Sequence, residues 1–482
     1  MSFLENIFTE DSHEIIGLNT ELKSLYILNK FKKENKSVIY VTSNLHDAEK
    51  IYSELTHHTD KVWFFPMDDF ITSVAVAASP ELKVTRLETI DNTINNEKGI
   101  VITNLMGYLR FLPSKEKFKQ SYITLETGKE YDMEELIEKL FNLGYRKETT
   151  VNMTGEIATR GFVLDIFPLN LDSPIRLEFW GDEIDSIKEF DIDTQLTNKK
   201  IDKVTIFPNT ETLTESNSFD TPHWEMVKEK GVTNISGYLN NKVTIYDNYR
   251  HILTNYEMLL DEMENYSKSI EIDPKTKYMF SLEDVLDKDP VIFEDIVEDI
   301  SKKALTYHNV EIPDFPKKAE EINKKLNDYL KLHKTVIICL NTRYQVNKLL
   351  DFLENPNITY TNENNIFENK INIIVKELNE GFQTENYVVI TEKELYGRKA
   401  ENNYKTKFKY GTRIKDITKL SIGDYVVHGT HGIGRYTGLK SIVKNGIKKD
   451  YLTIVYRDDD KLYIPVEKID LITKYSSSDG AV

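Results

Sequence analysis

The chain has 482 residues, more than one hydrophobic core usually supports, so we expect several domains. Its 40% hydrophobic and 29% charged residues exclude a disordered chain, and no apolar run is long enough to cross a bilayer. A net charge of -17 disfavours non-specific attraction to nucleic acid, so protein partners are the better expectation. The amino terminus lacks a secretory signal, and the single cysteine, Cys339, excludes an internal disulfide. Both observations predict a cytoplasmic protein.

The first part of the chain alternates short apolar strands with helical stretches. Strands are expected at 38–42, 62–65 and 100–104, and a helix at 47–55. This alternation predicts βαβ units around a parallel sheet. Because the apolar strand at 242–247 could return to that sheet, we expect residues 1–125 and 211–315 to form one α/β domain.

Residues 126–210 break this pattern with a helix at 133–143 and several strands, which predicts an inserted α+β domain. Apolar and polar residues alternate from Ile175 to Trp180, as expected for a strand with one buried face. Gly181-Asp182 then predicts a tight turn into the next strand.

The polar face of that strand carries a tryptophan, which a hydrophobic core does not need. Arg176 and Trp180 share this face, and Arg160 could approach Arg176 if its strand pairs with this one. On these residues alone, a solvated face with an amphipathic tryptophan is the simpler interpretation, and a binding surface is the alternative.

The remaining chain shows two further units and a connection between them. Strands and helices alternate again over 316–397, which predicts a second, small α/β domain. Residues 398–415 are polar and basic without an apolar period, as is typical of a linker. Residues 416–475 are strand-rich with glycine punctuation and predict a small β barrel.

The stretch from Gly17 to Ser24 has the spacing of a phosphate-binding loop, G-x-x-x-x-G-K-S, with a defect. Leu22 replaces the second glycine, whose conformational freedom lets such loops wrap phosphates, and Glu21 adds negative charge. We therefore interpret this stretch as a degenerate nucleotide site in which Gly17, Lys23 and Ser24 remain.

A second motif typical of nucleotide-binding proteins is also altered. Residues 243–248 resemble a strand ending in Asp-Glu, but Asn248 stands where a general base is required. Asp247 could still coordinate Mg²⁺.

No metal site is expected at His428 and His431, because no cysteine or further histidine cluster accompanies them. No nucleophile with its base can be assembled from the remaining residues, so no catalytic residue is assigned.

Together these motifs resemble the bacterial transcription-repair coupling factors, the Mfd family, over essentially the whole chain, as the amino-terminal half of such proteins. Residues 1–312 are similar to the UvrB-homologous module of that family, including the altered phosphate loop. Segments 158–168 and 176–187 are similar to its UvrA-recognition domain. The resemblance implies that the UvrA-contacting residues are Arg160, Arg176 and Trp180.

Residues 420–475 are similar to the RNA polymerase-interacting domain that this family shares with CarD-type regulators. The resemblance is carried by residues 422–428, 431–438, 450–452 and 461–466. It implies an SH3/Tudor-like barrel that pairs with the polymerase β subunit through an exposed strand edge. The implied contacts are Ile442, Lys461 and Tyr463; on sequence alone, Ile442 could equally be a core residue.

The resemblance implies a non-catalytic adaptor for nucleotide excision repair, which binds stalled RNA polymerase and recruits UvrA. The family's translocase motifs are absent from these 482 residues, so we expect a fragment or truncation with an uncovered UvrA-binding surface. ATP, Mg²⁺ and most DNA contacts would belong to the missing motor, and no cofactor or membrane partner is expected here. Two alternatives stay open: a UvrB-type protein that binds ATP weakly or handles DNA, and a CarD-like transcription regulator.

Overall fold

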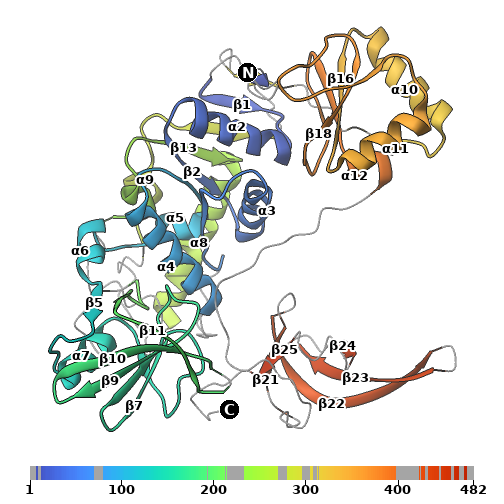
Figure 1. Ribbon diagram of the computed structural model, residues 1–482. Coiled ribbons are helices and arrows are strands. Elements are labelled where there is room, and N and C mark those ends of the chain that lie inside the picture. The colour runs from blue at the N-terminus through green and yellow to red at the C-terminus, as the bar shows by residue number, and fades with distance from the viewer. Residues whose placement is uncertain are drawn as a thin grey trace. The chain divides into compact units, whose positions relative to one another are not determined.

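The computed structural model consists of several sheets with helices packed against them (Figure 1). It describes residues 7–8, 12–69, 80–192, 194–211, 213, 233–269, 279–295, 304–307, 312, 314–397, 423, 425–428, 432–444, 447–456, 461–465 and 472–474. The chain divides into two compact units, Met1–Lys119 with Asp220–Thr406 and Gln120–Phe219 with Lys407–Val482. Within these described ranges, no helix combines the length and the apolar character needed to cross a membrane.

The first unit contains a seven-stranded parallel sheet. Its strands, in spatial order, are β15 (Leu305–Thr306), β1 (Glu14–Ile16), β14 (Val291–Glu294), β13 (Lys242–Asp247), β2 (Ser37–Thr42), β4 (Ile100–Asn104) and β3 (Val62–Phe65). The apolar strands β2, β3 and β4 are buried along their whole length, as expected where both faces of a parallel sheet are covered. β13 lies between β14 and β2, which confirms that the chain returns to this sheet.

Helices connect these strands. They are α2 (Thr20–Lys33), α3 (Leu45–Thr56), α4 (Pro80–Asn95), α5 (Leu105–Leu109), α6 (Lys115–Gln120), α8 (Tyr249–Ser269) and α9 (Leu282–Val285), with a short 3₁₀ turn, η2 (Ile235–Tyr238). α2, α3 and α5 each begin after an asparagine cap, Asn19, Asn44 or Asn104, whose side chain accepts a hydrogen bond from the first turn. These caps satisfy backbone N–H groups that the helix itself leaves unpaired, and so fix where each helix starts.

The same unit contains a second, smaller sheet with its own helices. Its strands, in spatial order, are β17 (Ile358–Tyr360), β18 (Ile371–Val375), β16 (Thr335–Leu340), β20 (Tyr387–Ile390) and β19 (Phe382–Gln383), and its helices are α10 (Ala319–Lys331), α11 (Arg343–Leu353) and α12 (Glu392–Tyr396). One buried apolar cluster joins this sheet to the first, because Cys339 and Phe382 pack in the same core as Leu22 and Ile51. Cys339 is buried, and burial raises the pKa of its thiol.

The second unit contains a six-stranded sheet over residues 146–201. Its strands, in spatial order, are β11 (Thr197–Ile201), β10 (Glu183–Phe190), β9 (Ile175–Trp180), β8 (Val163–Ile166), β7 (Glu156–Arg160) and β6 (Arg146–Lys147). One face packs in an apolar core with α7 (Met133–Asn142) and with the paired strands β5 (Ile123–Glu126) and β12 (Lys203–Ile206). Leu164, Leu177 and Ile187 form one cross-strand row of that core.

The last part of the chain forms a five-stranded antiparallel sheet. Its strands, in spatial order, are β24 (Lys461–Pro465), β23 (Ile447–Val455), β22 (Gly432–Lys444), β21 (Tyr425–His428) and β25 (Ile472–Lys474). Val426, Tyr436 and Leu452 lie in its small buried core. Closure of these strands into a barrel stays a prediction. The expected linker at 398–415 and His431 lie outside the described residues.

Candidate functional site

Two tight turns lie at the same end of the six-stranded sheet. Gly161-Phe162 joins β7 to β8, and Gly181-Asp182 joins β9 to β10. β8 and β9 are antiparallel, with Val163 opposite Glu178, so the start of β8 lies beside the end of β9. Both turn glycines have positive φ, 58° and 64°, which other residues seldom adopt. We call this end of the sheet, residues 160–163 and 180–183, the turn end.

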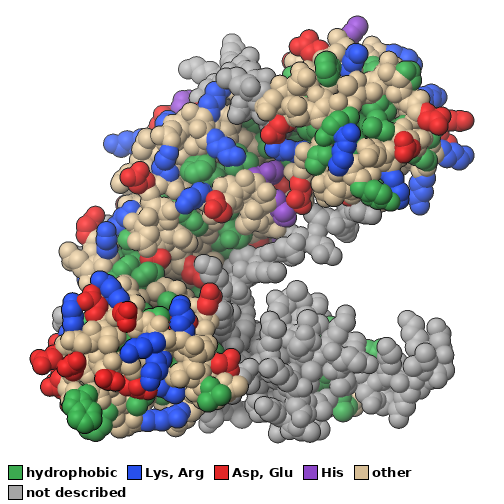
Figure 2. Space-filling view, viewed as in Figure 1, with side chains coloured by type: hydrophobic (Ala, Val, Ile, Leu, Met, Phe, Trp, Pro, Cys, Tyr) green, Lys and Arg blue, Asp and Glu red, His purple; other side chains and the backbone are tan. Residues whose placement is uncertain are grey.

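The turn end exposes two aromatic rings. Trp180 is 83% exposed and Phe162 is 68% exposed. The backbone N–H of Phe179 donates to the carbonyl oxygen of Phe162 at 2.9 Å, which holds the two segments side by side. Figure 2 shows exposed hydrophobic side chains among charged ones on the domain that contains β7, β9 and β10. Large exposed rings on neighbouring segments at one end of a sheet are candidates for an interaction site.

The predicted alternation of β9 is confirmed. Ile175, Leu177 and Phe179 are buried in the core, and Trp180 is exposed. Phe162 was not among the predicted site residues, and it lies in the turn before β8. The Arg-Gly-Phe sequence between two strands was the available signal, since an apolar residue in a tight turn has no core to enter.

Arg160 ends β7, one strand further from Arg176 than the sequence predicted. The prediction had only one strand here, but β7 and β8 form a hairpin in which Arg160 is opposite Val163. Val163 is in turn opposite Glu178, so Arg160 shares the outer face of the sheet with Arg176 and Trp180. The Arg160 side chain is exposed and forms no hydrogen bond or ion pair with any residue that the structure describes.

Arg176, in contrast, is held by its own sheet. Its Nε and Nη2 donate to the two carboxylate oxygens of Asp165, at 2.7 and 2.8 Å, and its Nη1 donates to the carbonyl oxygen of Gln195 at 3.3 Å. Its guanidinium also lies over the Phe190 ring, 4.6 Å from the ring centre. The hydrogen bond to Asp165 raises the pKa of Arg176. Such a two-pronged pair fixes the side chain and balances the charge of Asp165, which is 1% exposed.

The residues from Gly17 to Ser24 do not form a phosphate-binding loop. α2 begins at Thr20, and the Asn19 side chain accepts from the N–H of Leu22 at 3.0 Å, so Leu22, Lys23 and Ser24 are already helical. The Ser24 hydroxyl donates to the carbonyl oxygen of Thr20 at 3.0 Å. Gly17 has a φ of 80°, but the carbonyl oxygen of Tyr307 occupies the space where its Cβ would be.

Lys23 and Asp247 lie together, and they neutralise each other. The Lys23 ammonium lies 2.8 Å from Asp247 and 3.0 Å from Asp295, and its side chain is only 10% exposed. Burial lowers the pKa of Lys23, but the two carboxylates outweigh it, so the net shift is upward. Asn248 has a φ of 52° and donates to Asp295 at 2.9 Å. Asparagine suits this backbone conformation better than the glutamate that a general base would require.

The residues predicted to contact RNA polymerase lie on two neighbouring parts of the last sheet. Residues 441–444 of β22 and 447–450 of β23 pair with each other, and no other strand among the described residues pairs with them. We call these residues the β22–β23 ribbon. Ile442 lies in it, opposite Lys449. Tyr463 lies in the edge strand β24, where its hydroxyl accepts from Lys440 at 3.3 Å, and Lys461 begins that strand.

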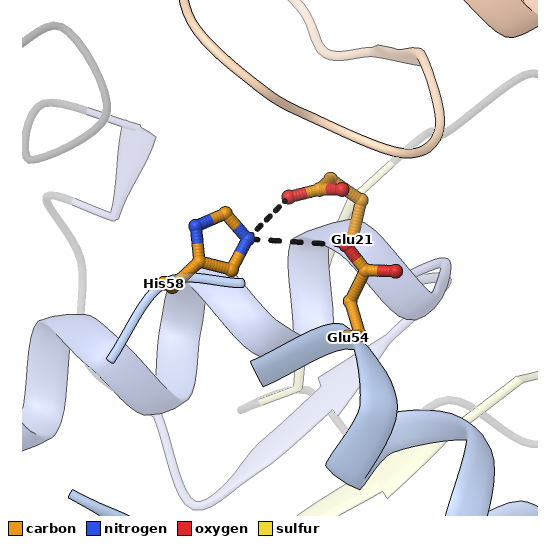
Figure 3. Close-up of side chains that lie close together, drawn as sticks. All are labelled: Glu21, Glu54 and His58. Atoms are coloured by element: carbon orange, nitrogen blue, oxygen red, sulfur yellow. Dashed lines mark hydrogen bonds and ion pairs between the residues drawn. The ribbon is translucent and has the colours of Figure 1, made fainter. Parts of the chain in front are cut away.

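A buried group of ionisable side chains lies within the first unit (Figure 3). His58 Nε2 lies 3.2 Å from Glu21 Oε1 and 3.8 Å from Glu54 Oε1. Burial raises the pKa of Glu21 to about 7. Burial lowers the pKa of His58, but hydrogen bonds to the two carboxylates outweigh it and raise the value to about 9. Among the described residues, this is the group whose ligand atoms lie close enough together for a metal ion.

Two family models match separate parts of the chain. The UvrB interaction domain matches residues 123–211, and the CarD-like/TRCF RID domain matches residues 420–476. These matches define a protein that combines a repair-type interaction domain with a CarD-like domain. The first region contains the six-stranded sheet with its turn end, and the second contains the β22–β23 ribbon.

Curated relatives share both regions. The chain is 26% identical to the transcription-repair-coupling factor of Staphylococcus haemolyticus, over 99% of this chain and 46% of that protein. It is 27% identical to that of Bacillus subtilis, over 97% of this chain and 45% of that protein. The chain is thus similar over nearly its whole length to transcription-repair-coupling factors, the family that its motifs resemble, and it spans about half the length of these relatives.

Proposed function

We propose that this chain is an adaptor that binds UvrA through the turn end and RNA polymerase β through the β22–β23 ribbon. Its role is to bring the excision-repair machinery to a stalled polymerase in the cytoplasm. The observation that carries the proposal is the pair of exposed rings, Trp180 and Phe162, beside the unpaired Arg160, in a domain matched by the UvrB interaction family. Buried aromatic and arginine side chains supply most of the binding energy in known interfaces.

The division of work between the two arginines follows from their contacts. Arg160 is free to donate to an acidic group of UvrA, because no described residue binds it. Arg176 already donates three hydrogen bonds within its own domain, two to Asp165 of β8 and one to the Gln195 carbonyl oxygen. In this proposal Arg160, Trp180 and Phe162 contact UvrA directly, and Arg176 shapes the surface.

The proposed contact with RNA polymerase uses backbone N–H and C=O groups of β22 that have no partner strand on one side among the described residues. The outer half of β22 pairs on one side only among the described residues, so its N–H and C=O groups can pair with a strand of another protein. Ile442 lies on this half of β22. The match of the CarD-like/TRCF RID domain to residues 420–476 supports the same assignment.

The proposal assigns no catalysis, nucleotide or metal cofactor to the degenerate nucleotide site. Lys23 is enclosed by two carboxylates of its own chain, and a phosphate would have to displace them. The helix that begins at Thr20 replaces the glycine-rich backbone that would wrap a phosphate. The ion pairs of Lys23 and the start of α2 at Thr20 both support a structural role for Gly17, Lys23, Ser24 and Asp247.

Calorimetric titration of UvrA tests the first half of the proposal. Arg160→Ala is expected to weaken binding at least tenfold, about 1.4 kcal/mol, because a charge-assisted bond is lost without any change to the sheet. Lys199→Ala is a matched control, since it removes an exposed cation from the same sheet away from the turn end. Equal UvrA affinities for the Arg160 variant and the unmodified chain would contradict the assignment.

A further inference from the structure

A compact set of metal-binding side-chain types lies in the first unit, whereas both proposed docking surfaces belong to the second. Glu21 comes from α2, Glu54 from α3, and His58 follows the end of α3 (Figure 3). Their side chains are 0%, 11% and 8% exposed. Two carboxylates that face each other away from water need a positive charge or a proton between them.

The geometry of the three groups fits one small cation. Tetrahedral bonds of about 2.0–2.1 Å place neighbouring ligand atoms about 3.3 Å apart. His58 Nε2 lies 3.2 Å from Glu21 Oε1 and 3.8 Å from Glu54 Oε1, and the ligand atoms of all three residues lie within 4.8 Å of one another. Little movement would bring them into a common coordination sphere.

Asn379 orients both carboxylates from the segment between β18 and β19. Its backbone N–H donates to Glu21 Oε2 at 3.1 Å, which leaves Oε1 facing His58. Its side-chain amide nitrogen donates to both oxygens of Glu54, each at 2.9 Å. Metal-binding carboxylates are held in this way in known sites, where such outer hydrogen bonds fix the orientation of each ligand.

We propose that Glu21, Glu54 and His58 bind one divalent first-row transition metal ion of the zinc type, with Asn379 positioning the two carboxylates. The site takes one oxygen from each glutamate and Nε2 of the histidine, and its fourth position takes water. An imidazole ligand favours zinc-type ions over Mg²⁺ and Ca²⁺, which prefer oxygen ligands alone. The bound ion would tie α2 to the end of α3, and Asn379 of the 376–381 segment would keep its hydrogen bonds to both ligating carboxylates.

The position of the site explains why it escapes detection in the sequence. Glu54 and His58 have the four-residue spacing of ligands on one helical face, but Glu21 and Asn379 are distant along the chain. The alternative state of the same residues is an ion pair of protonated His58 with the carboxylates, without a metal. The two states differ in whether added Zn²⁺ binds with a defined stoichiometry at these side chains.

Titration of the metal-depleted full chain with Zn²⁺, followed by calorimetry, tests the proposal. We expect one ion per chain, a raised melting temperature with Zn²⁺, and at least tenfold weaker binding in His58→Gln. Asn379→Ala should weaken binding about 10–100-fold, as loss of an orienting hydrogen bond does in other metal sites. His46→Gln is the matched control, because this exposed histidine lies on α3 away from the cluster and should leave the affinity unchanged.

Cobalt absorption spectroscopy keeps the test decisive if a variant does not fold. Co²⁺ added to the unmodified chain should give the intense visible bands of a four-coordinate site and no thiolate charge-transfer band. Absence of stoichiometric binding, or equal Zn²⁺ affinities for the unmodified and His58→Gln chains, would overturn the proposal. A cobalt–thiolate band would overturn it as well, because it would place the metal at Cys339.

Discussion

Arg160 and Arg176 share one face of the sheet, but their different hydrogen bonds indicate different roles. Arg160 is exposed and unpaired among the described residues, whereas Arg176 donates twice to Asp165. The family resemblance implied that both arginines contact UvrA. The Asp165–Arg176 pairing depends on the register of β8 against β9, which no local pattern specifies.

Replacement of Arg176 by alanine is expected to reduce stability as well as binding. It leaves the buried Asp165 carboxylate without its cation and removes the contact with the Phe190 ring, so we expect a loss of about 2–4 kcal/mol in unfolding free energy. Chemical denaturation followed by circular dichroism measures this loss. The double variant Asp165→Leu with Arg176→Met should recover much of it, since no unpaired charge remains; an unchanged midpoint for Arg176→Ala would contradict this account.

At the scale of elements, the starting point of α2 determines the backbone conformation of the stretch from Gly17 to Ser24. Asn19 caps the helix through Leu22 and also donates to the carbonyl oxygen of Gly381 at 3.0 Å. Asn19→Ala should therefore lower the unfolding free energy of the first unit by about 1–2 kcal/mol, measured by denaturant titration. Asn19→Asp serves as the comparison, because it keeps the cap acceptor; equal stability of the alanine variant and the unmodified chain would count against the capping role.

The β22–β23 ribbon gives the second prediction at this scale. Ile442→Arg introduces a charge into the two-stranded part of the sheet and should reduce capture of the polymerase β lobe at least tenfold in a surface-binding assay. UvrA binding by the same variant is the internal control, because the turn end lies on another sheet. Normal capture of the β lobe would mean that another strand edge makes the contact.

Much of the fold was accessible from local sequence patterns. The strands at 100–104, 175–180 and 242–247 were predicted with their observed bounds, because their apolar residues follow a clear period or form a continuous apolar run. The start of α2 was not predicted, because the G-x-x-x-x-G-K-S spacing suggested a loop at the place where Asn19 caps a helix. The Glu21, Glu54 and His58 group could not be predicted, because tertiary packing alone brings three separate positions together.

At the scale of the whole molecule, the proposed docking surfaces lie in separate sheets, and the first unit holds none of them. The turn end lies within the region matched by the UvrB interaction domain, and the β22–β23 ribbon lies within the CarD-like/TRCF RID region. The proposed adaptor function requires two separate surfaces on one chain, one for each partner.

The most direct test of this account is whether the chain bridges its two proposed partners. Polymerase β lobe is immobilised, and retention of purified UvrA is measured with the unmodified chain and with Trp180→Ala. We predict that UvrA is retained with the unmodified chain and that Trp180→Ala lowers the retention of UvrA at least tenfold. The Trp180→Ala chain should still be captured by the β lobe and should keep its melting temperature, because Trp180 is 83% exposed. Equal retention of UvrA with the Trp180 variant, or none with the unmodified chain, would contradict the adaptor function.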